Sequence, residues 1–254
     1  MRIAKFLVAI SASFWLLSAD RSAVGGIVEY SDDHGDIGLA FENGNELFLH
    51  YHFGIGAALD GAVNLVDQEL EPEDAYVRVP TVAKDIIPIA PQFSFLGTAG
   101  GDVWVLPQSG LAGAPFLGFA AEELGPEFLS AMLSFNSFSG PGDFSLWNSD
   151  TFGNPILQLD TSNGIIDPLA NKLLMGIGSH NHYNLGFTAE GIYNIGFEAS
   201  AVHSTLGTFT DSGVFTFVVG STTAVPEPTS IAMLSLAAVG LGYRRLRKRI
   251  LPVS

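Results

Sequence analysis

The chain has 254 residues, a formal net charge of −15 at pH 7 and no cysteine, so a disulfide framework, thiolate metal ligation and a cysteine nucleophile are all excluded. Between residues 24 and 224 only Arg78, Lys84 and Lys172 are basic, whereas 24 residues are acidic, which gives this span a formal charge of −21. Such a surface repels a phosphate backbone, and a nucleic-acid partner is therefore excluded.

The first 25 residues have the composition of a secretory signal peptide. Arg2 and Lys5 make a positive start, residues 6–17 are almost wholly apolar, and small residues follow. The apolar run is shorter than the roughly 20 residues of a typical membrane-spanning helix. We therefore expect residues 1–25 to form a signal-peptide helix that the secretion machinery recognises. The sequence leaves three cleavage positions open: after Ala19, Ala23 or Gly25.

Residues 26–221 predict one exported all-β domain. Polar and apolar residues alternate in segments such as 46–53 and 129–135, which is the pattern of half-buried strands. Turn dipeptides such as Asn43-Gly44 separate these segments at short intervals. Strands at this spacing favour a single β-sandwich-like domain. The one candidate helix is a single turn at residues 120–124.

Two His-x-His segments, residues 50–52 and 180–182, are the most informative polar motifs of this domain. Residues i and i+2 of a strand share a face, so each segment projects both of its imidazoles the same way. Residues 34–36, His-Gly-Asp, repeat the spacing. We expect the four paired histidines to converge on one metal ion, with His34 or Asp36 completing the shell. The candidate ligands are His34, Asp36, His50, His52, His180 and His182.

Zinc is the first metal that nitrogen and oxygen ligands of this kind predict, although imidazole also suits copper, iron and nickel. The alternative hypothesis is that these histidines are solvated strand residues that bind nothing. Glu122 and Glu123 are adjacent, so we expect them to diverge rather than to act as a paired acid and base. A metallohydrolase with an open metal position is the least favoured hypothesis.

Several further motifs run through the domain: His34-Gly-Asp36, Phe93-Ser-Phe-Leu-Gly97 with Gly101-Asp-Val-Trp-Val-Leu-Pro-Gln108, Ser139-Gly-Pro-Gly-Asp-Phe144, and His180-Asn-His-Tyr-Asn-Leu-Gly-Phe187 running on to Phe217-Val-Val-Gly220. Together they resemble the choice-of-anchor M family and its actinobacterial surface-anchored relatives. Leu185 stands where that family usually has Trp, which changes one aromatic contact. The resemblance implies a surface domain found with different anchors, and the metal-ion transporters beside some relatives imply a connection with metal.

Residues 222–254 form a tail of three parts. A short motif precedes an uncharged apolar stretch, residues 229–243, and an arginine-rich terminus, residues 244–249. The positive-inside rule keeps the basic cluster cytoplasmic and places the domain outside. The motif consists of Val225, Pro226, Glu227 and Pro228.

This tail resembles the PEP-CTERM sorting signal in all three parts. The resemblance implies recognition by exosortase, cleavage near the two prolines, and release to or anchoring at the cell surface, often beside exopolysaccharide. It also implies that a C-terminal hydrophobic helix anchors the protein transiently in the inner membrane. The sequence therefore predicts an exported, exosortase-sorted protein of the cell surface or extracellular matrix that is not an enzyme. The alternative is an extracytoplasmic divalent-metal-binding protein with a zinc-like site.

Overall fold

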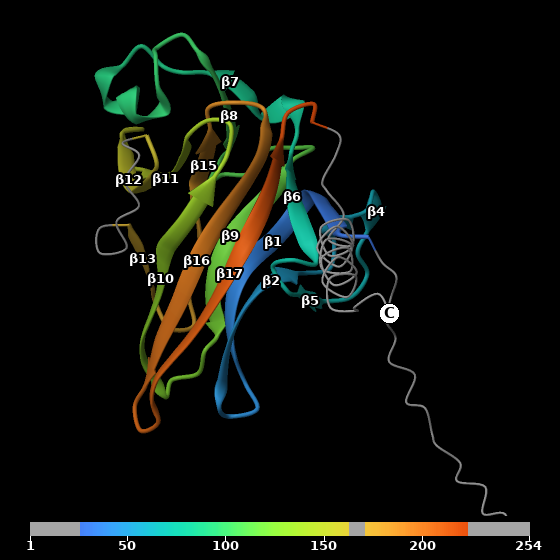
Figure 1. The fold of residues 1–254 in the computed structure, drawn as a ribbon, viewed down its shortest axis with the longest axis vertical. Coiled ribbons are helices and arrows are strands. Elements are labelled where there is room, and N and C mark those ends of the chain that lie inside the picture. The colour runs from blue at the N-terminus through green and yellow to red at the C-terminus, as the bar shows by residue number, and fades with distance from the viewer. Residues whose placement is uncertain (1–25, 163–170, 223–254) are drawn as a thin grey trace, which may run out of the picture.

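The computed structural model describes residues 26–162 and 171–222, and these residues form an all-β fold with two sheets (Figure 1). Both expected terminal helices, together with the sorting motif, lie outside the described residues. In the part of the chain that is described, no helix combines the length and hydropathy that a membrane span requires.

Most of the described chain is strand, with two short 3₁₀ helices, η1 (Thr81–Ala83) and η2 (Pro91–Leu96). The strands are β1 (Val28–Glu42), β2 (Glu46–Phe53), β3 (Ala58–Leu59), β4 (Ala62–Val63), β5 (Gln68–Leu70), β6 (Ala75–Val79), β7 (Lys84–Ile86), β8 (Asp102–Leu106), β9 (Pro115–Glu123), β10 (Phe128–Ser139), β11 (Phe144–Ser149), β12 (Pro155–Asp160), β13 (Lys172–Met175), β14 (His180–His182), β15 (Asn184–Phe187), β16 (Gly191–His203) and β17 (Gly207–Val219).

The alternation that predicted the strands also sets which side chains are buried. In β2 the apolar members of the alternating pattern face the core: Leu47, Leu49, Tyr51 and Phe53 are all at most 3% exposed. A tight turn at Asn43-Gly44 joins β1 to β2, and both residues have positive φ, 51° and 72°. Asparagine and glycine tolerate this left-handed backbone, which is why the dipeptide predicts a hairpin.

The larger sheet has the order β13-β10-β16-β17-β6-β1-β2-β5 and folds into two layers. Strand β1 connects these layers, because it changes partners along its length. Its first residues pair with β6 in parallel and with β3, whereas residues from Asp33 onward pair with β9 in parallel and with β2. The change of partner occurs at Asp33, which has a left-handed φ of 64°. As a result β14, β9, the second part of β1, and β2 lie side by side and face β16 and β17 across the core.

The smaller sheet has the order β12-β11-β15-β8-β7. Phe144 on β11 and Phe187 on β15 pack against Phe217 of the larger sheet, with ring centroids 6.4 and 5.3 Å from that of Phe217. The two sheets therefore share one apolar core, an arrangement consistent with the expected β-sandwich.

The expected helical turn at residues 120–124 was wrong, because these residues continue strand β9 and end it. The pairing with β1 steps from Gly38–Ala120 to Ala40–Glu123, so β9 holds one extra residue in this interval. This bulge breaks the alternation of side chains. Glu122 and Glu123 are both exposed as a result, and both reach histidines on the outer face of the sheet.

Candidate metal centre

Four neighbouring strands carry every candidate ligand on the outer face of one sheet. Their order is β14, β9, β1 and β2, and between the histidines of the outer strands β9 contributes Gly118 and Ala120, whereas β1 contributes Asp36 and Gly38. Two rows of Cα partners cross these strands: His182, Gly118, Asp36 and His52 in one, and His180, Ala120, Gly38 and His50 in the other.

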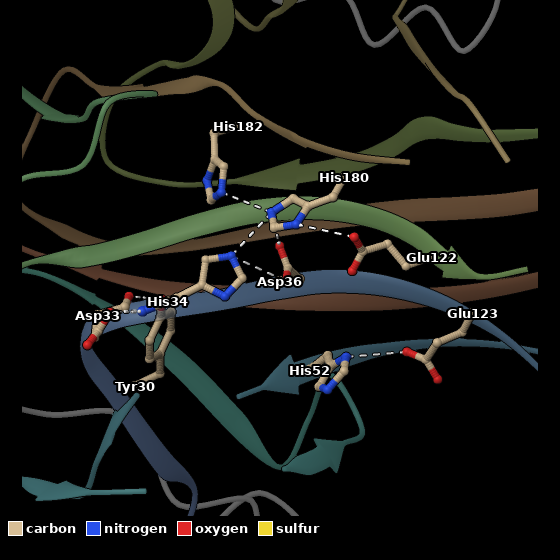
Figure 2. A network of polar contacts seen from close by, with 9 residues as sticks. All are labelled: Tyr30, Asp33, His34, Asp36, His52, Glu122, Glu123, His180 and His182. Carbon is tan, nitrogen blue, oxygen red and sulfur yellow. Dashed lines mark hydrogen bonds and ion pairs between the residues drawn. The ribbon is translucent and has the colours of Figure 1, made fainter. Parts of the chain in front are cut away.

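Three imidazoles meet in a first cluster, formed by His34, His180 and His182 (Figure 2). The Nε2 atom of His180 lies 2.9 Å from Nε2 of His182 and 3.2 Å from Nε2 of His34. Ligands that bind one tetrahedral zinc ion at 2.0–2.1 Å lie roughly 3.3 Å from one another. The spacing of these nitrogens therefore suits a shared metal ion.

Asp36 on β1 lies next to this cluster. Its Oδ1 lies 3.1 Å from His180 Nε2, and its Oδ2 lies 3.6 Å from His34 Nε2. The side chain is 6% exposed, and Oδ1 has no aligned hydrogen-bond donor. Burial raises the pKa of this carboxyl, although the charges of His34, His180 and His52 act in the opposite direction. An ionised Asp36 in this place needs a cation beside it.

The environment of His180 Nε2 is the strongest structural argument that this donor set suits a cation. This one atom has three polar neighbours within 3.2 Å, two imidazole nitrogens and a carboxylate oxygen. An imidazole nitrogen carries either one hydrogen or one lone pair, so it can satisfy only one of them. A positive ion between these atoms accepts all their lone pairs at once.

His182 is held rigidly in its place. Its ring stacks on Phe116 with a centroid distance of 3.6 Å and an angle of 3° between the planes. Burial, followed by the nearby charge of His180, lowers the pKa of His182 to about 4. The ring is therefore neutral at pH 7 and keeps the lone pair that metal ligation requires.

His50 and His52 on β2 and Glu123 on β9 form a second cluster on the same sheet face. Glu123 Oε1 lies 3.4 Å from His50 Nε2 and 3.3 Å from His52 Nδ1. The polar contacts with His50 and His52 lower the pKa of Glu123 to about 2. The hydrogen bond with Glu123 in turn raises the pKa of His52, against the effect of burial.

The structure thus divides the six predicted ligands between two clusters instead of one. His180 and His182 meet His34 and Asp36, whereas His50 and His52 meet Glu123. The two His-x-His segments share a sheet face, as their spacing indicates, but two strands lie between them. His203, which has no partner motif, lies apart and accepts backbone hydrogen bonds in the turn after β16.

Sequence reasoning missed Glu122 and Glu123 as neighbours of the histidines. They do diverge, as adjacent residues were expected to: Glu122 Oε1 lies 3.7 Å from His180 Nδ1, while Glu123 contacts the second cluster. The β9 bulge that brings both to this face has no signal in the pattern, because it depends on pairing with β1. The run of small residues at alternate positions, Gly118 and Ala120, was the available clue that other side chains occupy this face.

Comparison with known families concerns the C-terminal tail. The family described as PEP-CTERM protein-sorting motif matches residues 224–248. The chain carries a PEP-CTERM sorting motif. The motif supports an exported protein that crosses the membrane, is processed there by exosortase and is sorted to the cell surface. No curated protein and no solved structure matches the chain.

The PEP-CTERM motif begins close to the end of the described fold. The last described residue, Thr222, accepts a hydrogen bond of 2.6 Å from Arg78 through its carbonyl oxygen. Only Thr223 lies between it and the matched residues. The matched family covers the tail alone, so the resemblance of the β-domain to choice-of-anchor M proteins stays a prediction.

Proposed function

We propose that this chain is an exosortase-sorted cell-surface protein whose exported domain, residues 26–221, binds a divalent transition-metal ion without catalysing a reaction. The sorting motif supports the location. The convergence of His34, His180 and His182 on one point beside a buried carboxylate supports the binding function.

Zinc fits this cluster best. Three imidazole nitrogens and an adjoining carboxylate are ligands that zinc accepts in proteins, and the domain has no cysteine thiolate to offer instead. Glu122 lies beside Nδ1 of His180, the ring nitrogen that faces away from the cluster. A carboxylate in this place orients a metal-bound imidazole and raises its basicity.

We propose binding rather than catalysis because both carboxylates near the three imidazoles are already in contact with them. Asp36 contacts His34 and His180, and Glu122 contacts His180. In a metallohydrolase a free carboxylate must instead reach the water that the metal activates. The strong negative charge of the domain also suits cation capture, since it raises the concentration of cations near the surface.

The test is the zinc content of the full chain, purified in mild detergent, dialysed against zinc chloride and then against metal-free buffer. We expect His34→Ala combined with His180→Ala to lose one equivalent of zinc relative to the unmodified chain. His203→Ala is the matched control and should retain the full content, because His203 lies outside both clusters. An unchanged zinc content in the double variant would show that these histidines are not ligands.

A further inference from the structure

The cluster of His50, His52 and Glu123 has the features of a metal site in its own right. Two imidazoles and one glutamate are a ligand set that zinc uses in proteins. The glutamate oxygen lies 3.4 and 3.3 Å from the two ring nitrogens, close to the separation of roughly 3.3 Å expected for ligands of one tetrahedral ion.

The ring of His50 is positioned through contacts at both of its nitrogens. Its Nδ1 lies 3.2 Å from the carbonyl oxygen of Phe48, which can only accept a hydrogen bond, so Nδ1 carries the hydrogen. The other nitrogen, Nε2, is directed at the Glu123 carboxylate and lies 3.4 Å from its Oε1, and an unprotonated imidazole nitrogen in this place can bind a metal ion beside that oxygen. His50 is fully buried, and its Nε2 has no aligned hydrogen-bond partner.

The site is also preorganised. The ring of His50 stacks on Phe48 with centroids 4.6 Å apart and planes 14° apart, as His182 stacks on Phe116 in the first cluster. Gly38 leaves the space next to His50, since a Cβ atom there would come within 3.0 Å of Nε2. His52 and Glu123 are about one-third exposed, so an ion from solvent can reach the cluster.

We propose that His50, His52 and Glu123 bind a second divalent transition-metal ion on the same sheet face as the first, so that each chain holds two. Strand β1 carries His34 and Asp36 of the first site, and Asp36 is the Cα partner of His52 in the second. The proposal does not depend on the first site, because the two clusters have no ligand in common.

The test is a count of bound zinc in the full chain, in the same detergent and dialysis protocol, combined with cobalt substitution. The unmodified chain should bind two equivalents. Glu123→Gln, which preserves the shape of the side chain, and His52→Ala should each bind one. Both residues are partly exposed, so these variants avoid the buried His50. Glu69→Gln, on the neighbouring strand β5, is the matched control and should bind two.

Combining Glu123→Gln with the His34 and His180 substitutions should remove all bound zinc. If the unmodified chain binds one equivalent of zinc and Glu123→Gln still binds it, the second site is overturned and the first stays intact. If the unmodified chain binds one equivalent of zinc that Glu123→Gln loses and the His34 and His180 substitutions retain, the first site is overturned and the second stays intact. Cobalt absorption bands of tetrahedral character should weaken in each single-site variant, and bands unchanged by Glu123→Gln would also overturn this proposal.

Discussion

At the scale of single residues, the sheet face that carries the histidines depends on a position without a side chain, Gly118. Gly118 on β9 lies between His182 and Asp36, and a Cβ atom at this position would collide with Oδ1 of Asp36 and come within 2.7 Å of His180 Nε2. Because Gly118 has no side chain, it leaves the space in which Asp36 and His180 meet.

We predict that Gly118→Ala abolishes zinc binding at the first cluster and leaves the second unaffected. The added methyl group must displace Asp36 or His180, and overpacking of this kind costs about 1–3 kcal/mol of stability. Zinc content, measured together with urea unfolding, checks both effects. Gly54→Ala is the control, because a Cβ atom there would make only an ordinary contact, 3.9 Å from Asp67. Full zinc content in Gly118→Ala would show that the site does not need this space.

The clustered histidines and Asp36 were predictable one by one as candidate ligands, but their division between two clusters and the contribution of Glu123 were not. Alternation places His50 and His52 on the outer face of β2, and this holds in the structure. His50 is nevertheless fully buried, because Phe48 and the bulged end of β9 cover it. That cover comes partly from a strand some 70 positions away in the sequence, and no local pattern specifies it.

At the scale of the elements, β1 decides how the layers connect. The sequence predicts a strand here, but nothing in the pattern shows that it changes partners at Asp33. The positive φ at Asp33 is stabilised locally, since its carboxylate accepts a hydrogen bond from the backbone N–H of His34 at 2.8 Å. The Tyr30 hydroxyl also donates to the carbonyl oxygen of Asp33. These bonds turn the strand just before its first metal-ligand candidate.

Arg78, one of the three basic residues between residues 24 and 224, stabilises the start of β1. Arg78 on β6 binds Oε2 of Glu29 through Nη2 at 2.8 Å and Nε at 3.0 Å, and the Tyr76 hydroxyl donates to the same oxygen at 2.6 Å. Arg78 also donates to the carbonyl oxygen of Thr222. One cation thus joins β1, β6 and the end of the described domain.

We predict that Glu29→Gln lowers the free energy of unfolding by about 1 kcal/mol at pH 7, the upper end of what ion pairs near the surface contribute. Burial acts to raise the pKa of Glu29, but the bonds from Tyr76 and Arg78 lower it overall. A carboxyl whose pKa is lower in the folded state stabilises the fold above its unfolded pKa of about 4.3, and this contribution is lost as the pH falls.

Urea unfolding of the two chains at pH 7 and again near pH 3 measures this difference. The gap between Glu29→Gln and the unmodified chain should shrink at the lower pH. Glu42→Gln, at the exposed far end of the same strand, should show no gap at either pH. A gap that persists near pH 3 would assign the effect to packing rather than to the charge of Glu29.

At the scale of the whole molecule, the charge and the C-terminal sorting motif were the most predictable features. The basic residues gather outside the described fold, and the described domain is left strongly acidic. Composition alone shows this, and the tail is confirmed as a PEP-CTERM motif. The order of strands was not predictable, since β9 and β14 reach β1 through pairings between residues that lie far apart in the sequence.

The last prediction concerns what remains of the chain after export. Within the described residues the buried core runs from Tyr30 to Val219, so removal of a signal peptide before residue 26 and cleavage within the sorting motif take away none of it. We therefore expect the surface-exposed protein to lack both ends and to keep its fold. Intact-mass analysis of protein from native cells measures the two new termini directly. Pro226→Ala combined with Pro228→Ala should leave the domain folded but retained in the inner membrane, because these substitutions alter the motif and not the core. Surface protein that still carries residues 1–19 and the arginine-rich terminus, or normal surface display of the proline variant, would contradict processing through this motif.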